Sequence, residues 1–505
     1  MFQYLLGTVI SPWTLAGGVV ALLVYYAWTK TRLKHEGHNI PPFPAPAKPF
    51  LGHTLLMKGK ILDNLQCMRE KAGDIYSLNL AGNHMIVVYG FENIREILVK
   101  YAAQTQDRPL DLGSKILGEE NHGLFGSSGA NWKEQRAVTN TILREFGMGK
   151  NLMAEKVATE VQMFINKLAS LEGQSVHLPS IARGAVCNIV CSVAFGHRFD
   201  YDDENYLRLM ENAYAYLAKG PPIWVFSAAT FLQKIPGDLF GIKEWEACIR
   251  DLNRSCKIEI NKIKQNLSQD DEPKSFIAAY LQEMDRRKES ATPTYLNEPN
   301  LVTIIKSLLI GGTDTTSTTI DWCVLFCLHH PEVQEKVFEE IKTHVGTSRA
   351  PDVSDIPNLC YLTAVIRETQ RLAGIAAFFS REVNESFKLH GYLIPKDSQL
   401  LILFNSVLHD ENVWENPQKF YPERFLDASG HLLKPKEFVP FGIGRRICIG
   451  AAMAKTELDL FLAAMFQRFR FEPEDPTAEL PSLEKVVALT VDPKPYKVRF
   501  TNRDL

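Results

Sequence analysis

The longest helical pattern in the chain spans Glu298–His330, and it restricts the possible folds more than any other stretch. At a rise of about 1.5 Å per residue, such a helix would be about 50 Å long. Apolar side chains occur on nearly every side of it: Ile304, Ile305, Leu308, Leu309, Ile310, Ile320, Val324, Leu325 and Phe326. A helix that is apolar all round is buried. We therefore expect one large, mainly helical domain with this helix at its centre.

The middle of this predicted helix carries residues that are unfavourable in such a place. Residues 311–316 read GGTDTT. Each glycine costs about 1 kcal/mol relative to alanine in a helix, and a buried carboxyl group must be desolvated. Glycine and threonine can also divert i−4 hydrogen bonds and open a local kink. We expect a groove there, with a hydroxyl and a carboxyl facing a ligand. The alternative, a polar patch facing solvent, fits poorly with the apolar flanks.

A glycine-rich loop with one cysteine, residues 441–450 (FGIGRRICIG), directly precedes another apolar helical pattern. The N-terminus of a helix favours an anion, which predicts a lowered pKa for the Cys448 thiol. Gly442 and Gly444 allow positive-φ turns that wrap backbone N–H groups around the sulfur. Gly450 leaves room for a large flat ligand close to the backbone.

The side chains of this loop indicate which ligand it would hold. Phe441 can shield the Cys448 sulfur from water, and Arg446 can pair with an anion at the edge of the ligand. A thiolate in such a loop suits one open coordination position on iron. The alternative is a buried structural cysteine beside a glycine-rich turn.

Two other spacings place polar side chains on shared helix faces. Trp132 and Arg136 are four residues apart, so both can donate hydrogen bonds to one buried anion. Glu368 and Arg371 are three apart and also face together. Each spacing alone is weak evidence for a functional site. A surface arginine over a half-buried tryptophan is common, and the pattern E-x-x-R occurs often by chance.

The loop pattern F-G-x-G-x-R-x-C-x-G resembles the haem-binding signature of the cytochrome P-450 monooxygenases. Residues 143–150 and 195–201 resemble the animal microsomal branch of that family, which contains drug-, steroid- and fatty-acid-oxidising members. The resemblance implies the cytochrome P-450 fold, mainly α with a minor β region. It also implies that Cys448 is the axial ligand of the iron of a b-type haem. The residues that it assigns to the haem are Trp132, Arg136, Arg381, Phe441, Gly442, Arg446 and Gly450.

The resemblance assigns roles to two further groups of residues. Glu368, Arg371 and Arg424 would form a buried ion network near the thiolate loop, which fixes geometry more than it stabilises. Asp314 and Thr315 would be the catalytic residues, delivering protons to dioxygen. The chain departs from the family in residues 371–381, which lack the prolines common there. We expect Phe378 and Phe379 to narrow the pocket wall at that point.

The activity that the resemblance implies is that of a haem-thiolate monooxygenase. One oxygen atom of dioxygen would enter an apolar organic substrate, such as a steroid, a fatty acid or a xenobiotic. Electrons would come from NADPH through a separate NADPH–cytochrome reductase, with cytochrome b5 as a further candidate partner, since the chain has no Rossmann or flavin motif. The alternatives are a haem-thiolate isomerase or dehydratase that acts on peroxides, and a non-enzymatic haem- or lipid-binding sensor on a membrane.

The N-terminal end predicts a membrane anchor. No charged side chain occurs in residues 1–29, and Lys30, Arg32 and Lys34 follow at once. Such a run approaches the ~20 residues that a bilayer needs, and positive charge after a single span keeps that side cytoplasmic. The alternative is a cleaved signal peptide, although the basic start and the cleavage site of one are missing.

The predicted domains are therefore an anchor over residues 1–29, a basic and proline-rich linker over 30–50, and a haem-thiolate catalytic domain over 51–505. The expected location is the endoplasmic reticulum membrane, single-pass, with the catalytic domain in the cytosol. The formal net charge of −3 gives no indication of nucleic-acid binding. The nine scattered cysteines, without a C-x-x-C pair, indicate reduced thiols rather than a disulfide framework or a zinc site.

Overall fold

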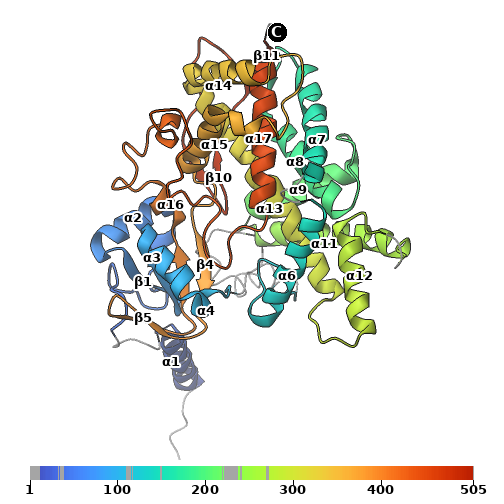
Figure 1. The fold of residues 1–505 in the computed structure, drawn as a ribbon. Coiled ribbons are helices and arrows are strands. Elements are labelled where there is room, and N and C mark those ends of the chain that lie inside the picture. Colours follow the sequence, from blue (N-terminus) through green and yellow to red (C-terminus); the bar gives the residue numbers. More distant parts are fainter. Residues whose placement is uncertain are drawn as a thin grey trace, which may run out of the picture.

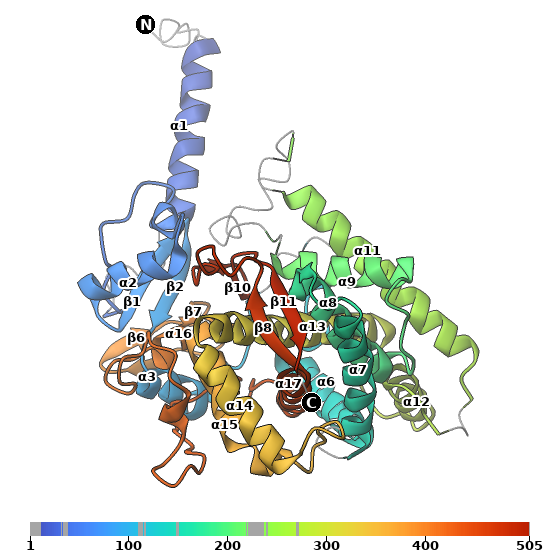
Figure 2. The ribbon, with the colours of Figure 1, turned by 90° about the horizontal axis from the view of Figure 1, so that it is seen from above.

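The chain is arranged around the long central helix α13 (Glu298–His329), which crosses the middle of the molecule (Figures 1 and 2). The structure, a computed structural model, describes residues 12–31, 33, 39–109, 115, 118–147, 151–218, 220, 237–238, 241–268 and 272–503. Most residues of α13 are buried, as its apolar pattern predicts. Its first turn is fixed by Asn297, whose side chain accepts a hydrogen bond from the backbone N–H of Asn300 at 2.9 Å.

Helices make up most of the described chain. In chain order they are α1 (Pro12–Lys30), α2 (Ile61–Ala72), α3 (Phe91–Arg95), α4 (Ala102–Thr105), α6 (Gly129–Glu145), α7 (Asn151–Ala169), α8 (Leu178–Ala194), α9 (Glu204–Ala218), α11 (Ile242–Gln265), α12 (Phe276–Glu289), α13, α14 (Pro331–His344), α15 (Cys360–Ala373), α16 (Phe404–Leu408) and α17 (Ala451–Arg468). Short helical segments of tighter or wider pitch are Thr54–Met57, Glu96–Lys100, Ile356–Asn358 and Pro422–Phe425.

The strands form small sheets at the sides of this helical body. They are β1 (Ile75–Leu80), β2 (Asn83–Val88), β3 (Ser175–Val176), β4 (Phe379–Glu382), β5 (Phe387–Leu389), β6 (Tyr392–Ile394), β7 (Gln399–Ile402), β8 (Phe469–Pro473), β9 (Lys485–Val487), β10 (Val491–Pro493) and β11 (Val498–Asn502). The sheet orders are β1-β2-β7-β4, β3-β11-β8, β10-β9 and β5-β6. The largest sheet joins the antiparallel β1–β2 hairpin to β7, which runs parallel to β2 and pairs Met85 with Gln399.

A two-residue loop joins β1 to β2. Leu80 pairs with Asn83, so Ala81 and Gly82 form a two-residue loop. Both have positive φ, 52° and 95°, which is the conformation of a type I′ turn.

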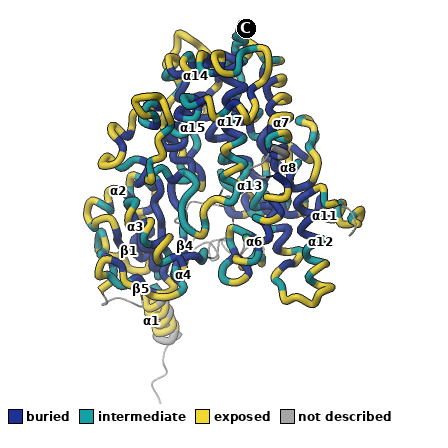
Figure 3. Tube along the Cα trace, in the orientation of Figure 1, coloured by how far each residue is buried: buried dark blue, intermediate teal, exposed yellow. Residues whose placement is uncertain are grey.

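The core of the molecule surrounds α13, which packs against α8, α9, α11, α15 and α17. One large cluster of buried apolar side chains joins these helices, and two smaller clusters lie on the two faces of the β1-β2-β7-β4 sheet. In Figure 3 the buried residues fill the middle of the molecule, and the exposed ones lie on its outer turns. The site region on α13 is therefore held by several elements at once.

Helix α1 lies apart from this core and extends away from the body (Figure 2). Within the part of the chain that the structure describes, no helix has both the length and the hydropathy that crossing a bilayer requires. Residues 1–11 of the predicted anchor lie outside the described residues. The anchor therefore stays a prediction.

Candidate functional site

The cysteine loop lies at the start of α17, as predicted, and its glycines are required by its shape. Gly442 and Gly444 have φ of +74° and +79°, in the region that disfavours side chains. A Cβ on Gly444 would also lie 2.3 Å from the carbonyl oxygen of Leu98. The loop closes on itself where the Cys448 N–H donates to the Phe441 carbonyl oxygen at 3.0 Å.

The Cys448 side chain is accessible to solvent and is also surrounded by many protein atoms. It is exposed, yet desolvation by the surrounding protein is the main cause that raises the pKa of its thiol. A sulfur that lies in a recess of the protein surface accounts for both observations. The prediction of a lowered pKa is therefore wrong for the protein alone: the Gly450 N–H and Arg136 lower the pKa of Cys448, but desolvation outweighs them. A bound metal cation would deprotonate such a thiol outright.

Three arginines and a tryptophan gather beside this loop. Arg136, on α6, donates to the carbonyl oxygen of Ile447 at 2.6 Å. The Arg446 guanidinium lies 3.9 Å from the ring centre of Trp132 and donates to backbone carbonyl oxygens of the 106–127 segment. Arg381, at 3% exposure, donates to the carbonyl oxygen of Ser380 at 2.9 Å.

The electrostatics of this cluster favour an anion. Burial is the main cause that lowers the pKa of Arg446 to about 9 and of Arg381 to about 10, and the neighbouring arginines lower both further. Among the described residues, none of the three arginines forms an ion pair with a carboxylate within 4 Å. The buried indole N–H of Trp132 likewise finds no hydrogen-bond acceptor among them. Buried polar groups normally have partners, so an anionic ligand would complete this site.

The middle of α13 forms a second wall of the candidate site. A Cβ on Gly311 would meet nothing within 4 Å, although the helix is buried on both sides of it. Gly312 packs against α8 and lies near the first turn of α17: an added Cβ would be 2.8 Å from Cγ2 of Val190 and 3.8 Å from Cε of Met453. The Thr315 hydroxyl donates to the Gly311 carbonyl oxygen at 2.8 Å, the i−4 bond expected from the sequence. The kink predicted there does not interrupt the helix.

Asp314 lies in a separate ionic cluster. Its Oδ2 accepts a hydrogen bond from the Thr490 hydroxyl at 2.9 Å. Its Oδ1 lies 3.5 Å from Nε of Arg183, on α8. Arg183 in turn lies 4.0 Å from Asp492, on β10. The sequence analysis missed Arg183, Thr490 and Asp492, because they are far from Asp314 in the chain and belong to no recognisable motif.

Glu368 is in contact with both arginines that the sequence analysis grouped with it. Arg371 donates to its two carboxylate oxygens at 2.8 and 2.9 Å, and Arg424 donates to Oε1 at 3.0 Å. Glu368 and Arg371 are fully buried. Arg371 also donates to the Leu408 carbonyl oxygen at 2.8 Å, so the network ties α15 to the segment that leads to the cysteine loop.

The segment without prolines turns its two phenylalanines in different directions. Gly374, with φ of +61°, ends α15 in the left-handed conformation common after helices. Phe378 is buried in the apolar cluster that contains β1 and β2. Phe379 packs against Phe404, with ring centres 6.2 Å apart. Phe378 is therefore part of the core, and a narrowing of the pocket wall by Phe379 stays a prediction.

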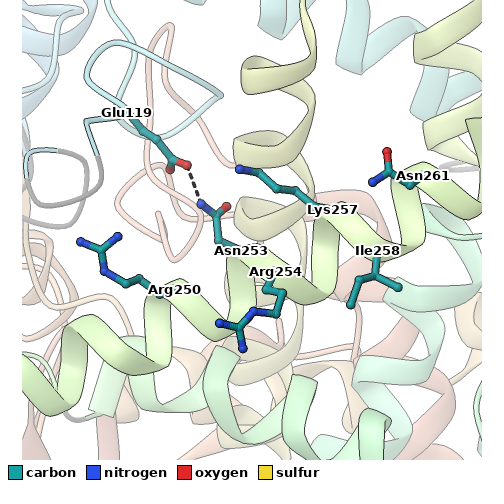
Figure 4. Close-up of a pocket in the computed structure, with 7 residues that line it drawn as sticks. All are labelled: Glu119, Arg250, Asn253, Arg254, Lys257, Ile258 and Asn261. Carbon is teal, nitrogen blue, oxygen red and sulfur yellow. Dashed lines mark hydrogen bonds between the residues drawn. The ribbon is translucent and has the colours of Figure 1, made fainter.

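A surface hollow of about 440 Å³ lies elsewhere, along α11. Its lining is Glu119, Arg250, Asn253, Arg254, Lys257, Ile258 and Asn261 (Figure 4). Glu119 reaches the helix from a preceding loop and accepts hydrogen bonds from Asn253 at 2.6 Å and Lys306 at 2.5 Å. None of the lining residues belongs to the cysteine loop or to the arginine cluster, so this hollow is separate from the candidate site.

A family model described as cytochrome P450 matches residues 41–500 of the chain. The chain belongs to the cytochrome P450 family. It is similar to cytochrome P450 2D28 of Mesocricetus auratus, at 34% identity over 487 residues, which cover 92% of this chain and 94% of that protein. It is also similar to two proteins of Homo sapiens. Cytochrome P450 2U1 is 32% identical over 517 residues, covering 96% of this chain and 93% of the relative. Cytochrome P450 2D6 is 33% identical over 492 residues, which cover 95% of this chain and 97% of that protein.

Membership in the cytochrome P450 family confirms the expected fold, mostly helical with small sheets, and the expected class, a haem-thiolate monooxygenase. The residues present fit a haem. The Cys448 thiol is exposed within a protein-lined recess, and open space lies beside Gly311 and Gly450. Among the described residues, the three arginines have no carboxylate partner and the Trp132 indole N–H has no acceptor. A flat ring that carries two carboxylates and a central iron matches these donors.

Proposed function

We propose that this cytochrome P450 inserts one oxygen atom of dioxygen into a small apolar organic molecule, such as a steroid, a fatty acid or a xenobiotic. Its electrons come from NADPH through a separate NADPH–cytochrome reductase, with cytochrome b5 as a second candidate donor. The observation that carries this proposal is the placement of Cys448 in a loop beside three arginines, of which Arg381 is buried and Arg136 and Arg446 are half-buried.

The bound haem would supply the iron that activates dioxygen. Cys448 would hold the iron as a thiolate. Arg136, Arg381, Arg446 and the Trp132 indole would bind the two propionates, because charge-assisted hydrogen bonds to carboxylates are strong. Phe441, Gly442 and Gly450 would shape the loop around the ring.

Thr315 and Asp314 would deliver protons to the reacting oxygen. A hydroxyl both donates and accepts hydrogen bonds, so Thr315 can hold an ordered water near the oxygen that must be protonated. Asp314, at 1% exposure, would pass protons toward that water. The buried apolar side chains on either side keep other water away. Glu368, Arg371 and Arg424 would hold the chain behind the thiolate loop in position.

The location follows from the N-terminus. Apolar and aromatic side chains on α1 are strongly exposed, among them Leu22 at 69% and Tyr25 at 61%, and an exposed apolar helix is a membrane-binding feature. We propose an anchor over residues 1–29, a linker over 30–50 and a catalytic domain over 51–505. The endoplasmic reticulum membrane, with the catalytic domain in the cytosol, places the domain beside a membrane-bound reductase. Removal of residues 1–29 should leave a haem-loaded domain, and detection of a cleaved N-terminus in the mature protein would contradict the anchor.

A basic surface supports the reductase proposal. Lys133, Lys434 and Arg445 are exposed, and Lys150 lies outside the described residues. Lys436 is exposed too, but it pairs with Glu92 at 2.9 Å. Reversal of Lys133 and Lys434 to glutamate should raise the KM for reductase at low salt and leave substrate binding unchanged. Equal KM values would leave an ordinary solvated surface as the better description.

The central test replaces the proposed ligand. Cys448→Ser should lose most of its haem and the red-shifted absorption band of the reduced carbon monoxide complex. Cys360→Ser, at another partly exposed cysteine, is the matched control and should keep both. A Cys448→Ser variant that retains the band and turnover would show that the assignment is wrong.

Two other functions are separated by turnover assays. A haem-thiolate isomerase or dehydratase would convert organic peroxides without reductase, and a sensor would bind haem or lipid without turnover. The neighbouring Asp314 and Thr315 favour the monooxygenase, because the other two need no proton delivery to dioxygen. A screen of apolar compounds for shifts of the haem absorption would identify the substrate class.

A further inference from the structure

The Asp314 carboxylate is connected to a second carboxylate by one hydroxyl group. Thr490 Oγ1 lies 2.9 Å from Oδ2 of Asp314 and 3.4 Å from Oδ2 of Asp492. The other oxygen of Asp492 accepts a hydrogen bond from Thr318 at 3.0 Å. The hydroxyl of Thr490 therefore lies between the two acids and is within hydrogen-bond distance of both.

Arg183 holds the two acids from a third direction. Its Nε lies 3.5 Å from Asp314 and its Nη2 lies 4.0 Å from Asp492. The guanidinium carbon lies 3.6 Å from the ring centre of Tyr214, on α9, which covers the cluster. Helices α8, α9 and α13 and strand β10 thus each contribute a side chain.

Exposure rises along this cluster from Asp314 outward. The side chain of Asp314 is 2% exposed, that of Arg183 13% and that of Asp492 16%. Asp492 is therefore the carboxylate that can exchange protons with water more easily, and Asp314 is the one nearer to the middle of α13.

The charges of the cluster do not balance when both acids are ionised. Two carboxylates face one guanidinium, and desolvation raises the pKa of both, with the charge of Asp492 raising that of Asp314 further, to about 6. Charges of this cluster also shift the pKa values of three other described groups: Asp321 on α13, Tyr214 on α9 and His177 before α8. A proton on one of the two acids leaves one carboxylate opposite one guanidinium, which balances these charges.

We propose that Asp492 and Thr490 form the outer part of a proton path. This path returns a proton to Asp314 each time Asp314 has given one away. Protonated Asp492 gives its proton to the Thr490 oxygen while the Thr490 hydroxyl gives its own proton to ionised Asp314. One O–H bond breaks and one forms at each exchange, so no charge is left on the hydroxyl. Water then reprotonates Asp492. This inference rests on the proposed monooxygenase function, for which Asp314 would be the proton donor.

A purely structural role is the competing explanation, since the same contacts tie β10 to α13. The two roles differ in what near-isosteric variants should do. Asp492→Asn and Thr490→Val keep the size of each side chain but remove proton transfer. Glu484→Gln is the matched control: it removes a carboxylate 45% exposed on the same hairpin, which pairs with Lys494 and not with this cluster.

The first experiment measures turnover with reductase and NADPH, using lauric acid or another compound that the spectral screen selects. Asp492→Asn and Thr490→Val should bind haem and substrate as the unmodified protein does. Their product formation should be slower by about one order of magnitude, less than the 10²–10⁴-fold that a positioned donor contributes. The solvent isotope effect should rise, and the control should change neither rate nor isotope effect.

A second arm adds hydrogen peroxide in place of dioxygen, NADPH and reductase. Peroxide already carries the two electrons and two protons of reduced dioxygen, so the path is not needed. Both variants should then match the unmodified protein. A variant that is equally slow with peroxide has a structural defect, and this result would overturn the proton path.

A third arm needs no turnover. The raised pKa of Asp314 means that the folded protein binds a proton more tightly than the unfolded chain, so stability falls as pH rises through about 4 to about 6. Asp492→Asn removes the neighbouring charge and lowers the pKa of Asp314. The loss of melting temperature between about pH 4 and about pH 6 should therefore be smaller in this variant than in Glu484→Gln. An identical loss would show that the two acids are not coupled.

The outcomes keep the two proposals apart. An unmodified protein that has no turnover with NADPH or with peroxide contradicts the monooxygenase function itself. Turnover of the unmodified protein together with unchanged rates and isotope effects in Asp492→Asn and Thr490→Val overturns the proton path alone.

Discussion

Thr316 of α13 donates a hydrogen bond to Glu457 of α17 across the 3.0 Å between Oγ1 and Oε2. Glu457 is fully buried, and its other oxygen has no hydrogen-bond partner among the described residues. Desolvation raises the pKa of Glu457 to about 8. The carboxyl group is therefore neutral at pH 7, and it joins the central helix to the helix that follows the cysteine loop.

This contact predicts how stability depends on pH. Because the folded protein holds the Glu457 proton up to about pH 8 and the unfolded chain releases it near its ordinary value, stability falls as pH rises between the two. The slope for one proton is about 1.4 kcal/mol per pH unit. Glu457→Gln, which is neutral throughout, should flatten this part of the profile, as measured by chemical unfolding at several pH values. Glu339→Gln on the exposed face of α14 is the control and should keep the full slope.

Removal of the Thr315 hydroxyl should separate electron consumption from product formation. Thr315→Ala should bind substrate and accept electrons as before but release more of the NADPH-derived electrons as hydrogen peroxide. Thr343→Ala removes a hydroxyl with the same i−4 bond, to the Glu339 carbonyl oxygen at 2.7 Å, on α14. The measurement compares NADPH consumed, product and peroxide. Full product yield in Thr315→Ala would refute the proton role of Thr315.

Removal of Glu368, the acid of the buried ion network, should strongly lower the free energy of unfolding. Glu368→Ala leaves Arg371 buried at 0% exposure without its partner, which costs about 3–5 kcal/mol. Asp251→Ala removes an acid with the same i,i+3 spacing from an exposed pair with Arg254, worth about 0–1 kcal/mol. Unfolding followed by circular dichroism gives the difference directly. Similar losses in both variants would contradict the role given to burial.

The shape of the cysteine loop predicts a specific effect at Gly444. Gly444→Ala places a Cβ 2.3 Å from the Leu98 carbonyl oxygen and strains a φ of +79°. Gly430→Ala has almost the same φ, +81°, but meets nothing within 4 Å. The control thus bears the backbone strain, about 1–2 kcal/mol, without the clash. Haem content after purification should fall strongly only in Gly444→Ala; equal haem content in the two variants would mean that the loop adapts.

The sequence predicts those parts of this molecule whose information is local. The 298–330 pattern, the β1–β2 hairpin and the cysteine loop are each determined within a few dozen residues, by periodicity, turn residues or glycine spacing. The partners of Asp314 could not be predicted, because Arg183 and Asp492 look like ordinary surface residues in their own segments. The raised pKa of Cys448 was missed for a related reason: desolvation depends on what other elements cover the sulfur, whereas helix position is visible in the sequence.

The parallel pairing of β2 with β7 joins residues about 300 positions apart, Met85 with Gln399. While the protein is being synthesised, the β1–β2 hairpin leaves the ribosome long before its partner strand exists. Its open edge and the apolar face beside it are templates for pairing with other chains. Efficient production should therefore depend on molecular chaperones that cover the N-terminal hairpin until residue 402 has emerged, and on how slowly the intervening helices are translated.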